Sequence, residues 1–184
     1  MTTITPLAIP EVLLITPKRH GDARGWFTET WSQKALAGTA ADTTFVQDNQ
    51  AFSAAKGTLR GLHFQKGPNA QGKLIRALRG AIFDVALDIR PGSPTYGTWV
   101  SAELTAEGGE QLWAPRGFAH GYCTITDDCE IFYKVDAPYA PDHEGGVAWN
   151  DPDLGIPWPL DGEPLLSGKD QVLPRLKDLG PVGF

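Results

Sequence analysis

His63 has the most distinctive surroundings of the side chains that could move protons in this sequence. It lies in TLRGLHFQ, residues 58 to 65, close to an arginine and a glutamine, and it could be a buried packing residue, a metal ligand or a base. A mononuclear metal site needs about three convergent ligands, usually with a local pair such as HxH. The other histidines, His20, His120 and His143, are isolated, so the pattern argues against a metal site.

Other catalytic signatures are absent or weak. Ser53 and Ser167 are not part of a GxSxG turn, and neither Cys123 nor Cys129 has an obvious activating neighbour. The two cysteines are too few for a disulfide scaffold, and we expect them to be free and partly buried. No Rossmann or Walker glycine pattern is present. The sequence therefore gives no support for nucleophilic catalysis, a bound nicotinamide or an ATP reaction.

Acid–base chemistry remains as a possibility. A neutral imidazole, with a reference pKa of about 6.5, can accept a proton at neutral pH, and a carboxylate such as Asp170 on its other nitrogen would fix the tautomer. A tyrosine across the ligand could return a proton to the opposite face, and a lysine could stabilise an oxyanion formed between the two transfers. If His63, Lys73, Tyr133 and Asp170 converge, they form an epimerase site, which only the fold can show.

Composition sets the general class of the protein. With 184 residues, 41% of them hydrophobic and 21% charged, we expect a soluble single domain over residues 1–184. No apolar run approaches the roughly 20 residues of a membrane span, and the N-terminus lacks the features of a signal peptide, so we expect a cytoplasmic protein. The net charge of −6 argues against nucleic acid or anionic membranes as partners, and an anionic ligand would need a local basic cluster.

The predicted elements are mostly strands. Alternating or β-branched and aromatic segments recur about every 10 residues with turn residues between them, which predicts an all-β sandwich or barrel. One short helix is expected within residues 32–40, ending at Gly38. From about residue 150 the chain is rich in loops and should wrap the barrel. The predicted strands are KLIRALRG, AIFDVALDI, GTWVSAELT, HGYCTIT and CEIFYKVD.

Two of these strands raise questions about the interior. Alternation in AIFDVALDI places Asp84 on the opposite face from Phe83, where it could be a surface carboxylate or, in a closed jelly roll, an inward carboxylate near a cationic partner. In HGYCTITDDCEIFYKVD, a two-residue hairpin loop would pair Tyr122 with Tyr133 and place His120 on the same face. These three side chains could line a pocket or simply pack together.

Several longer stretches, taken together, resemble a known family in order and spacing, the dTDP-4-dehydrorhamnose 3,5-epimerases. The resemblance runs from about residue 10 to residue 171. It implies a jelly-roll (cupin) fold with a few short helices, no metal or organic cofactor, and a homodimer in which N-terminal strand material crosses to the partner. The stretches are GDARGWFTETW, FVQDNQAFSAAKGTLRGLHFQ, QGKLIRALRGAIFDVALDIRPGSPTYGTW, QLWAPRGFAHGY, YKVDAPYAPDHEGGVAWNDPDLGIPWP and LLSGKD.

The resemblance also implies an activity, the cofactor-independent epimerisation of dTDP-4-dehydro-6-deoxy-D-glucose at C3 and C5 to dTDP-4-dehydro-L-rhamnose. It assigns His63 as the base, Asp170 as its orienting carboxylate, Tyr133 as the proton donor and Lys73 as the group that stabilises the enolate, with Asp84 as a structural partner. Tyr139 resembles the residue that stacks on thymine. The other implied ligand contacts are Arg24, Phe27, Glu29, Gln47, Asn49, Arg60, His120, Glu144 and Lys169.

Two features fit this pattern less simply. Strict alternation puts Arg60 and His63 on opposite strand faces, so both can reach one ligand only at a bend, a strand start or a dimer surface. Ala51 and Phe52 replace a serine and a basic residue that the family often has, which affects the expected nucleotide contacts. Two other functions stay open: a mono-epimerase that inverts only C3 or only C5, and a sugar-nucleotide binding module without turnover.

Overall fold

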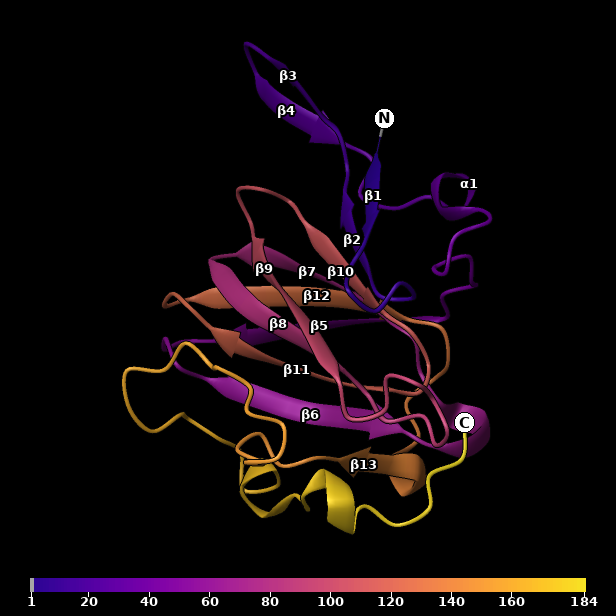
Figure 1. Cartoon of the computed structure of the whole chain (residues 1–184). Helices are drawn as coiled ribbons and strands as arrows, with labels where there is room; N and C mark the ends of the chain where they lie inside the picture. Colours follow the sequence, from indigo (N-terminus) through magenta and orange to yellow (C-terminus); the bar gives the residue numbers. More distant parts are fainter. Residues whose placement is uncertain (1) are drawn as a thin grey trace.

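Two antiparallel sheets stack on each other in the computed structural model, which describes residues 2–184 (Figure 1). The predicted all-β, jelly-roll fold is confirmed. In spatial order, one sheet contains β1 (Thr3–Pro6), β2 (Leu13–Thr16), β10 (Gln111–Ala114), β7 (Lys73–Arg79), β12 (Cys129–Val135) and β5 (Gln47–Ser53). The other contains β13 (Glu144–Gly146), β6 (Leu59–Gln65), β11 (Phe118–Thr124), β8 (Ala81–Asp88) and β9 (Trp99–Thr105).

The main core lies between the sheets because alternate residues of both sheets point toward each other. Ile75 and Ile131 from the six-stranded sheet meet Ile82, Leu104 and Phe118 from the five-stranded sheet in one buried cluster. All five strands that the sequence predicts are present. The sheets therefore provide two rigid walls from which inward side chains face each other.

Strand β8 is buried on both faces, which decides the position of Asp84. Val85 and Leu87 point away from the central core and pack against Ile156 and Trp158 of the C-terminal tail. Asp84 points the other way and is fully buried. It is therefore the inward carboxylate and not a surface residue.

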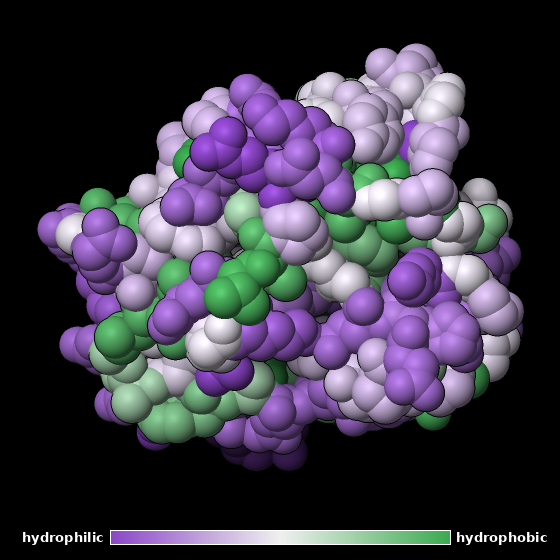
Figure 2. All heavy atoms as spheres, turned by 90° about the horizontal axis from the view of Figure 1, so that it is seen from below, coloured by the Kyte–Doolittle hydropathy of each residue, from purple (hydrophilic) through white to green (hydrophobic). Residues whose placement is uncertain are grey.

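The C-terminal tail runs over the outer face of the five-stranded sheet and includes two short 3-10 helices, η3 (Asp170–Val172) and η4 (Leu176–Asp178). Leu165 pairs with Thr58 in an isolated parallel bridge, just before β6 begins. Val172 and Leu165 stay exposed, and Figure 2, which views the molecule from below, shows hydrophobic patches among hydrophilic ones.

The predicted hairpin between residues 120 and 136 is wrong. Strands β11 and β12 are not paired: β11 lies between β6 and β8, and β12 lies between β5 and β7 in the other sheet. The turn between them bonds instead to neighbouring segments, with Ile125 N donating to Ala81 O and Asp128 N to Ala54 O. The connection therefore crosses from sheet to sheet, and Tyr122 and Tyr133 come from opposite walls.

The predicted helix is confirmed but is shorter than expected. Helix α1 (Gln33–Leu36) begins after Ser32, whose hydroxyl accepts a hydrogen bond from Ala35 N, and it ends before Gly38, which has φ of 76°. The other short helices are η1 (Gly67–Asn69) and η2 (Pro141–His143). No helix within residues 2–184 has the length and apolar character needed to cross a bilayer.

A bulge in β6 changes the expected arrangement of Arg60 and His63. On β11, His120 pairs with His63 and Tyr122 pairs with Arg60, so two residues of β6, Gly61 and Leu62, lie opposite the single residue Gly121. The extra residue shifts the alternation by one position. Arg60 and His63 therefore face the same side, and the expectation of opposite faces is wrong.

Gly61 is required for this bulge, which gives a prediction. It has φ of +120°, and a Cβ atom there would lie 2.6 Å from the Cα of Gly121 and 2.8 Å from the backbone oxygen of His120. We expect Gly61→Ala to lower the free energy of unfolding by about 2 kcal/mol or more, since the facing backbone cannot move aside cheaply. Urea unfolding measures the change.

The matched control is Gly162→Ala, because a Cβ at Gly162 meets no atom within 4 Å. Its free energy of unfolding should stay within about 0.5 kcal/mol of the wild type. If Gly61→Ala is as stable as this control, the close approach of β6 to Gly121 is not what shapes the bulge.

Candidate active site

A cavity of about 260 Å³ opens between the two sheets. We call it the central cavity. It receives side chains from the bulged strand β6, from β11 beside it, from β5, β7 and β12 of the opposite sheet, and from the tail. Its lining residues are Ala51, Arg60, His63, Lys73, His120, Tyr122, Tyr133, Ser167, Lys169 and Asp170.

His63 is held by a carboxylate from the far end of the chain. Its Nε2 lies 2.5 Å from Oδ1 of Asp170, which is almost fully buried, and Asp170 N in turn donates to the Ser167 hydroxyl. Burial alone would raise the pKa of Asp170, but hydrogen bonds from His63, Ser167 and the Gly61 backbone outweigh it and hold the pKa below its usual value. An ionised Asp170 accepts the Nε2 proton, so Nδ1 keeps its lone pair.

Tyr133 faces this pair from the opposite sheet, because it lies on β12 while His63 lies on β6. Burial raises the pKa of Tyr133 above its usual value; Arg60 opposes this rise, whereas Glu144 and Tyr139 add to it. The phenol therefore stays protonated at neutral pH and can donate a proton.

Lys73 lies beside His63 at the start of β7. Its Nζ donates to the backbone oxygen of His63 at 3.2 Å, and the side chain is 9% exposed. Burial lowers the pKa of Lys73 to about 8, although the carboxylates of Asp84 and Glu144 act in the opposite direction. Lys73 therefore offers a poorly solvated ammonium group to any oxygen that gains negative charge in the cavity.

A second imidazole–carboxylate pair lies next to the first. His120 is the cross-strand partner of His63, and its Nε2 lies 2.7 Å from Oδ1 of the buried Asp84. This hydrogen bond fixes the ring of His120 in the wall of the central cavity. Within residues 2–184, no three or more His, Cys, Asp and Glu side chains are grouped so that they could hold a metal ion.

A groove of about 110 Å³ adjoins the central cavity and shares His63, Lys73 and Tyr133 with it. The groove also contains Gln47, Asn49, Tyr139 and Glu144, four of the predicted ligand contacts. The two spaces therefore border each other at these three shared side chains.

Hydrogen bonds fix the Tyr139 loop over this groove. Tyr139 N donates to Gln47 Oε1 at 3.0 Å, and the Tyr139 hydroxyl donates to Glu144 at 3.3 Å. Gln65, at the end of β6, accepts from Ala140 N and donates to the Pro138 oxygen. The ring of Tyr139 nevertheless stays 55% exposed, so it can be covered by a flat ligand.

Positive charge gathers around the site despite the net charge of −6. Arg60, Lys73 and Lys169 line the central cavity, and Lys169 also forms an ion pair with Glu144. Burial alone would raise the pKa of Glu144, but Lys169 and His63 hold it below its usual value. This is the local basic cluster that an anionic ligand requires.

Strand β5 places Ala51 and Phe52 on opposite sides with respect to the site. Alternation turns Gln47, Asn49 and Ala51 toward the site, while Phe52 points outward and is 51% exposed. Ala51 therefore affects the wall of the central cavity, whereas Phe52 contributes only its backbone oxygen, which accepts a hydrogen bond from Arg60.

Three predicted contacts lie elsewhere. Arg24, Phe27 and Glu29 belong to the hairpin of β3 (Arg19–Asp22) and β4 (Gly25–Thr28) and the residue that follows it, and this hairpin projects from the end of the molecule opposite β6 (Figure 1). Arg24 forms a salt bridge with Asp22.

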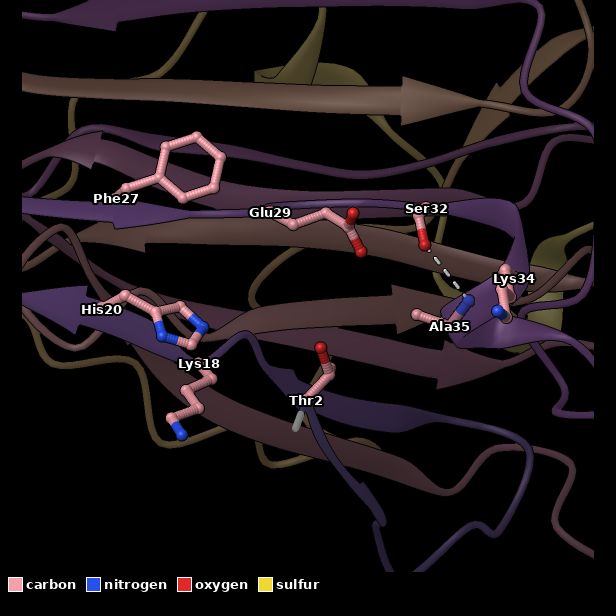
Figure 3. A pocket seen from close by; sticks show the side chains of 8 residues that line it. All are labelled: Thr2, Lys18, His20, Phe27, Glu29, Ser32, Lys34 and Ala35. Atoms are coloured by element: carbon pink, nitrogen blue, oxygen red, sulfur yellow. Dashed lines mark hydrogen bonds between the residues drawn. The ribbon is translucent and has the colours of Figure 1, made fainter.

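Phe27 and Glu29 border a separate cavity of about 630 Å³ with Lys18, His20 and Ser32 (Figure 3). No residue of the central cavity lines it. The single chain therefore does not bring these predicted contacts to His63.

Two further residues have no role in the sequence prediction. Ser167 lines the central cavity and orients Asp170, and Gln65 lines the groove and holds the Tyr139 loop. Tyr122, His120 and Tyr133 all line the central cavity, as one of the two interpretations of the sequence expected, but Tyr133 comes from the other sheet and not from the same hairpin face. The role of Gln65, a buried glutamine at the end of a strand, can be recognised only in the fold. For Ser167, its position three residues before Asp170 was the one feature of the sequence that indicated a role.

The comparisons with known proteins agree with this geometry. Residues 6–178 match the family model described as dTDP-4-dehydrorhamnose 3,5-epimerase. The chain belongs to the dTDP-4-dehydrorhamnose 3,5-epimerase family. The resemblance seen in the sequence is confirmed, and the protein is an isomerase of the epimerase type.

Individual members of the family are similar over nearly their whole length. A dTDP-4-dehydrorhamnose 3,5-epimerase from Sinorhizobium fredii is 54% identical over 97% of this chain and 91% of its own. The enzyme of that name from Bacillus anthracis, with TDP and PPi bound, has a TM-score of 0.92 at 46% identity, covering 95% of this chain and 99% of its own. A Legionella pneumophila epimerase in complex with dTDP-4-keto-L-rhamnose has a TM-score of 0.93 at 40% identity, covering 97% and 95%.

The pKa of Lys73 leads to a prediction for the pH dependence of this epimerase. Because its pKa lies at about 8, the ammonium is present below that pH and is lost as the pH rises through it. We expect kcat/KM, which reports the free enzyme, to fall on the alkaline side with a midpoint near pH 8. In Lys73→Arg the charge persists at all these pH values, so kcat/KM is lower but this alkaline fall disappears.

Steady-state rates measured from pH 6 to 10 on both proteins test this. An unchanged alkaline midpoint in Lys73→Arg would assign the fall to another group.

Proposed function

We propose that this protein epimerises dTDP-4-dehydro-6-deoxy-D-glucose at C3 and C5 to give dTDP-4-dehydro-L-rhamnose, without a cofactor. The observation that carries the proposal is the position of His63 and Tyr133 on opposite sheets, facing one cavity. Inversion of a carbon centre requires a base on one face and an acid on the other. The sandwich provides both, with the ligand between them.

The chemistry follows from the C4 ketone of the substrate. The ketone acidifies the protons on C3 and C5, because removal of either proton gives an enolate with its charge on the C4 oxygen. His63 accepts the proton through Nδ1, while Asp170 stabilises the imidazolium through Nε2. The ammonium of Lys73 stabilises the enolate oxygen, and Tyr133 then donates a proton to the opposite face of the ring.

The rest of the site suits a nucleoside diphosphate. Arg60 and Lys169 offer positive charge to the diphosphate, the exposed ring of Tyr139 can stack on thymine, and Gln47 and Asn49 can bond its polar edge. The Bacillus relative has TDP and PPi bound, and the Legionella relative has dTDP-4-keto-L-rhamnose. Both ligands fit this assignment.

The N-terminal hairpin suggests how the remaining contacts are used. Trp26 and Phe27 are 60% and 72% exposed on a projecting hairpin, and large exposed aromatic residues commonly mark an interface. We infer a homodimer of single-domain chains, in which Arg24, Phe27 and Glu29 of one protomer complete the site of the other.

The alternatives have less support. A mono-epimerase would use the same acid and base, but the relative at 54% identity carries the 3,5-epimerase name. A binding module without turnover has no need for an imidazole oriented by a buried carboxylate together with a phenol on the opposite wall.

Proton NMR of dTDP-4-dehydro-6-deoxy-D-glucose with the protein in D₂O tests the activity. We expect deuterium at both C3 and C5, together with the product of L configuration. His63→Ala should slow exchange at both positions by about 100-fold or more, with dTDP affinity unchanged within a few-fold. Tyr133→Phe should slow epimerisation more than exchange, because His63 can still return a solvent deuteron to the original face.

Exchange at one carbon only would identify a mono-epimerase. No exchange despite tight nucleotide binding would identify a binding module or another substrate. Equal loss of exchange and epimerisation in Tyr133→Phe would remove its role as the donor.

A mixed dimer tests the shared site. One protomer carries His63→Ala and its partner carries Arg24→Ala with Phe27→Ala, and two different affinity tags isolate the heterodimer. If the hairpin serves the opposite protomer, one of the two sites is intact, and activity should be about half that of the wild type. If each hairpin serves its own chain, neither site is intact and the heterodimer should be as inactive as its parent variants.

A further inference from the structure

Tyr122 provides a polar group that the mechanism above does not use. It lies on β11, lines the central cavity and is 5% exposed. Its hydroxyl is fully buried and makes no hydrogen bond of normal geometry with residues 2–184, although the Ser53 hydroxyl lies near enough to lower its pKa. A buried hydroxyl without a partner costs about 1–3 kcal/mol, so a position like this needs an explanation.

The surroundings place the hydroxyl close to the reacting groups. Tyr122 pairs across the strands with Arg60 on β6 and with Asp84 on β8. Its ring belongs to the core cluster against which Tyr133 packs, and the two tyrosine rings come from opposite sheets. Burial raises the pKa of Tyr122 to about 12. The hydroxyl is therefore a neutral hydrogen-bond donor beside the space between His63 and Tyr133.

Arg60 and Ser53 lie near this hydroxyl, and both lower the pKa of Tyr122. In the free chain Arg60 folds back onto β5, where it donates to the Phe52 oxygen at 3.0 Å and to the Ser53 hydroxyl at 3.4 Å. The second bond is long, and the guanidinium is exposed. A turn of Arg60 toward a diphosphate would break these two hydrogen bonds and would uncover the wall of the central cavity beside Tyr122 and the small Ala51 side chain.

We propose that the Tyr122 hydroxyl is a further substrate-positioning group, which donates a hydrogen bond to an oxygen of the sugar ring or of its hydroxyl groups. The central cavity holds the sugar between His63 and Tyr133, and the phenol of Tyr122 comes from the same strand as His120. An uncharged donor suits a hydroxyl or ether oxygen, whereas the positively charged side chains of the site would bind the diphosphate. This inference rests on the proposed function of the site.

Tyr122→Phe tests the proposal because it removes one oxygen atom and keeps the ring. The affinities to measure by calorimetry are those for dTDP and for dTDP-6-deoxy-D-glucose, which has no ketone and does not react. We expect affinity for the sugar nucleotide to fall about three- to tenfold and affinity for dTDP to stay within about twofold. The KM for the keto substrate should rise by a similar factor, with a smaller change in kcat.

Thermal unfolding of the free protein separates this role from a structural one. Because the hydroxyl makes no hydrogen bond of normal geometry in the free protein, Tyr122→Phe should have the same melting temperature as the wild type or a higher one. Tyr96→Phe is the control, since Tyr96 is 44% exposed and lines neither the central cavity nor the groove. It should change neither affinity nor stability.

Three results would overturn the inference. If Tyr122→Phe leaves the affinity for the sugar nucleotide unchanged, the hydroxyl does not contact the sugar. If the affinities for dTDP and for the sugar nucleotide fall equally, the hydroxyl acts on the nucleotide and not on the sugar. A lower melting temperature that Ser53→Ala reproduces, with both affinities unchanged, assigns the hydroxyl to Ser53. If the wild type neither binds nor turns over the sugar nucleotide, the proposed function itself fails, which is a different outcome from a silent Tyr122→Phe.

Discussion

The hydrogen bond between His63 and Asp170 is the interaction on which the site depends. It joins a strand of the five-stranded sheet to a tail residue 107 positions away in the chain. A buried carboxylate is stable only when it is paired, so the tail must bring Asp170 to the imidazole or leave a buried charge without a partner. The same tail covers the outer face of β8 with Ile156 and Trp158. The tail therefore both covers β8 and orients the base.

The two-sheet architecture explains why the remaining groups lie where they do. A sandwich holds inward side chains of opposite sheets at a fixed separation, which suits a reaction that needs an acid and a base on opposite sides of a flat ring. Burial then prepares each group, since it keeps the phenol of Tyr133 protonated and leaves the ammonium of Lys73 poorly solvated. Each group is ready before the substrate arrives, which reduces the cost of reorganisation during the reaction.

Sequence periodicity was enough to locate the strands but not to predict which strands pair with each other. Alternation with a period of two is a local property, and it located β7, β8, β9, β11 and β12. The pairing of β11 with β12 was wrong because two aspartates at a turn do not determine whether the chain folds back in the same sheet or crosses to the other one. A hairpin was expected because the two strands are adjacent in the sequence. In the structure, Ile125 and Asp128 of the connecting turn donate hydrogen bonds to other segments instead.

The site itself was predictable through the family resemblance rather than through residue patterns. The relation of Arg60 to His63 depends on one inserted residue at Gly61, and a glycine in a strand indicates either a bulge or simple close packing. The inward position of Asp84 required knowledge that the tail covers the other face of β8. Ser167 and Tyr122 gave little sequence signal, because their roles come from contacts with distant segments.

The central claim is that Asp170 orients His63 so that Nδ1 is the base, and nitrogen NMR of His63 tests it most directly. With ¹⁵N-labelled histidine, the neutral ring should have its proton on Nε2 and a free lone pair on Nδ1. In Asp170→Asn, the populations of the two tautomers should move toward each other, because the carboxylate no longer selects one. A proton on Nδ1 in the wild type, or an Asp170→Asn spectrum with the wild-type tautomer, would contradict this account of the base.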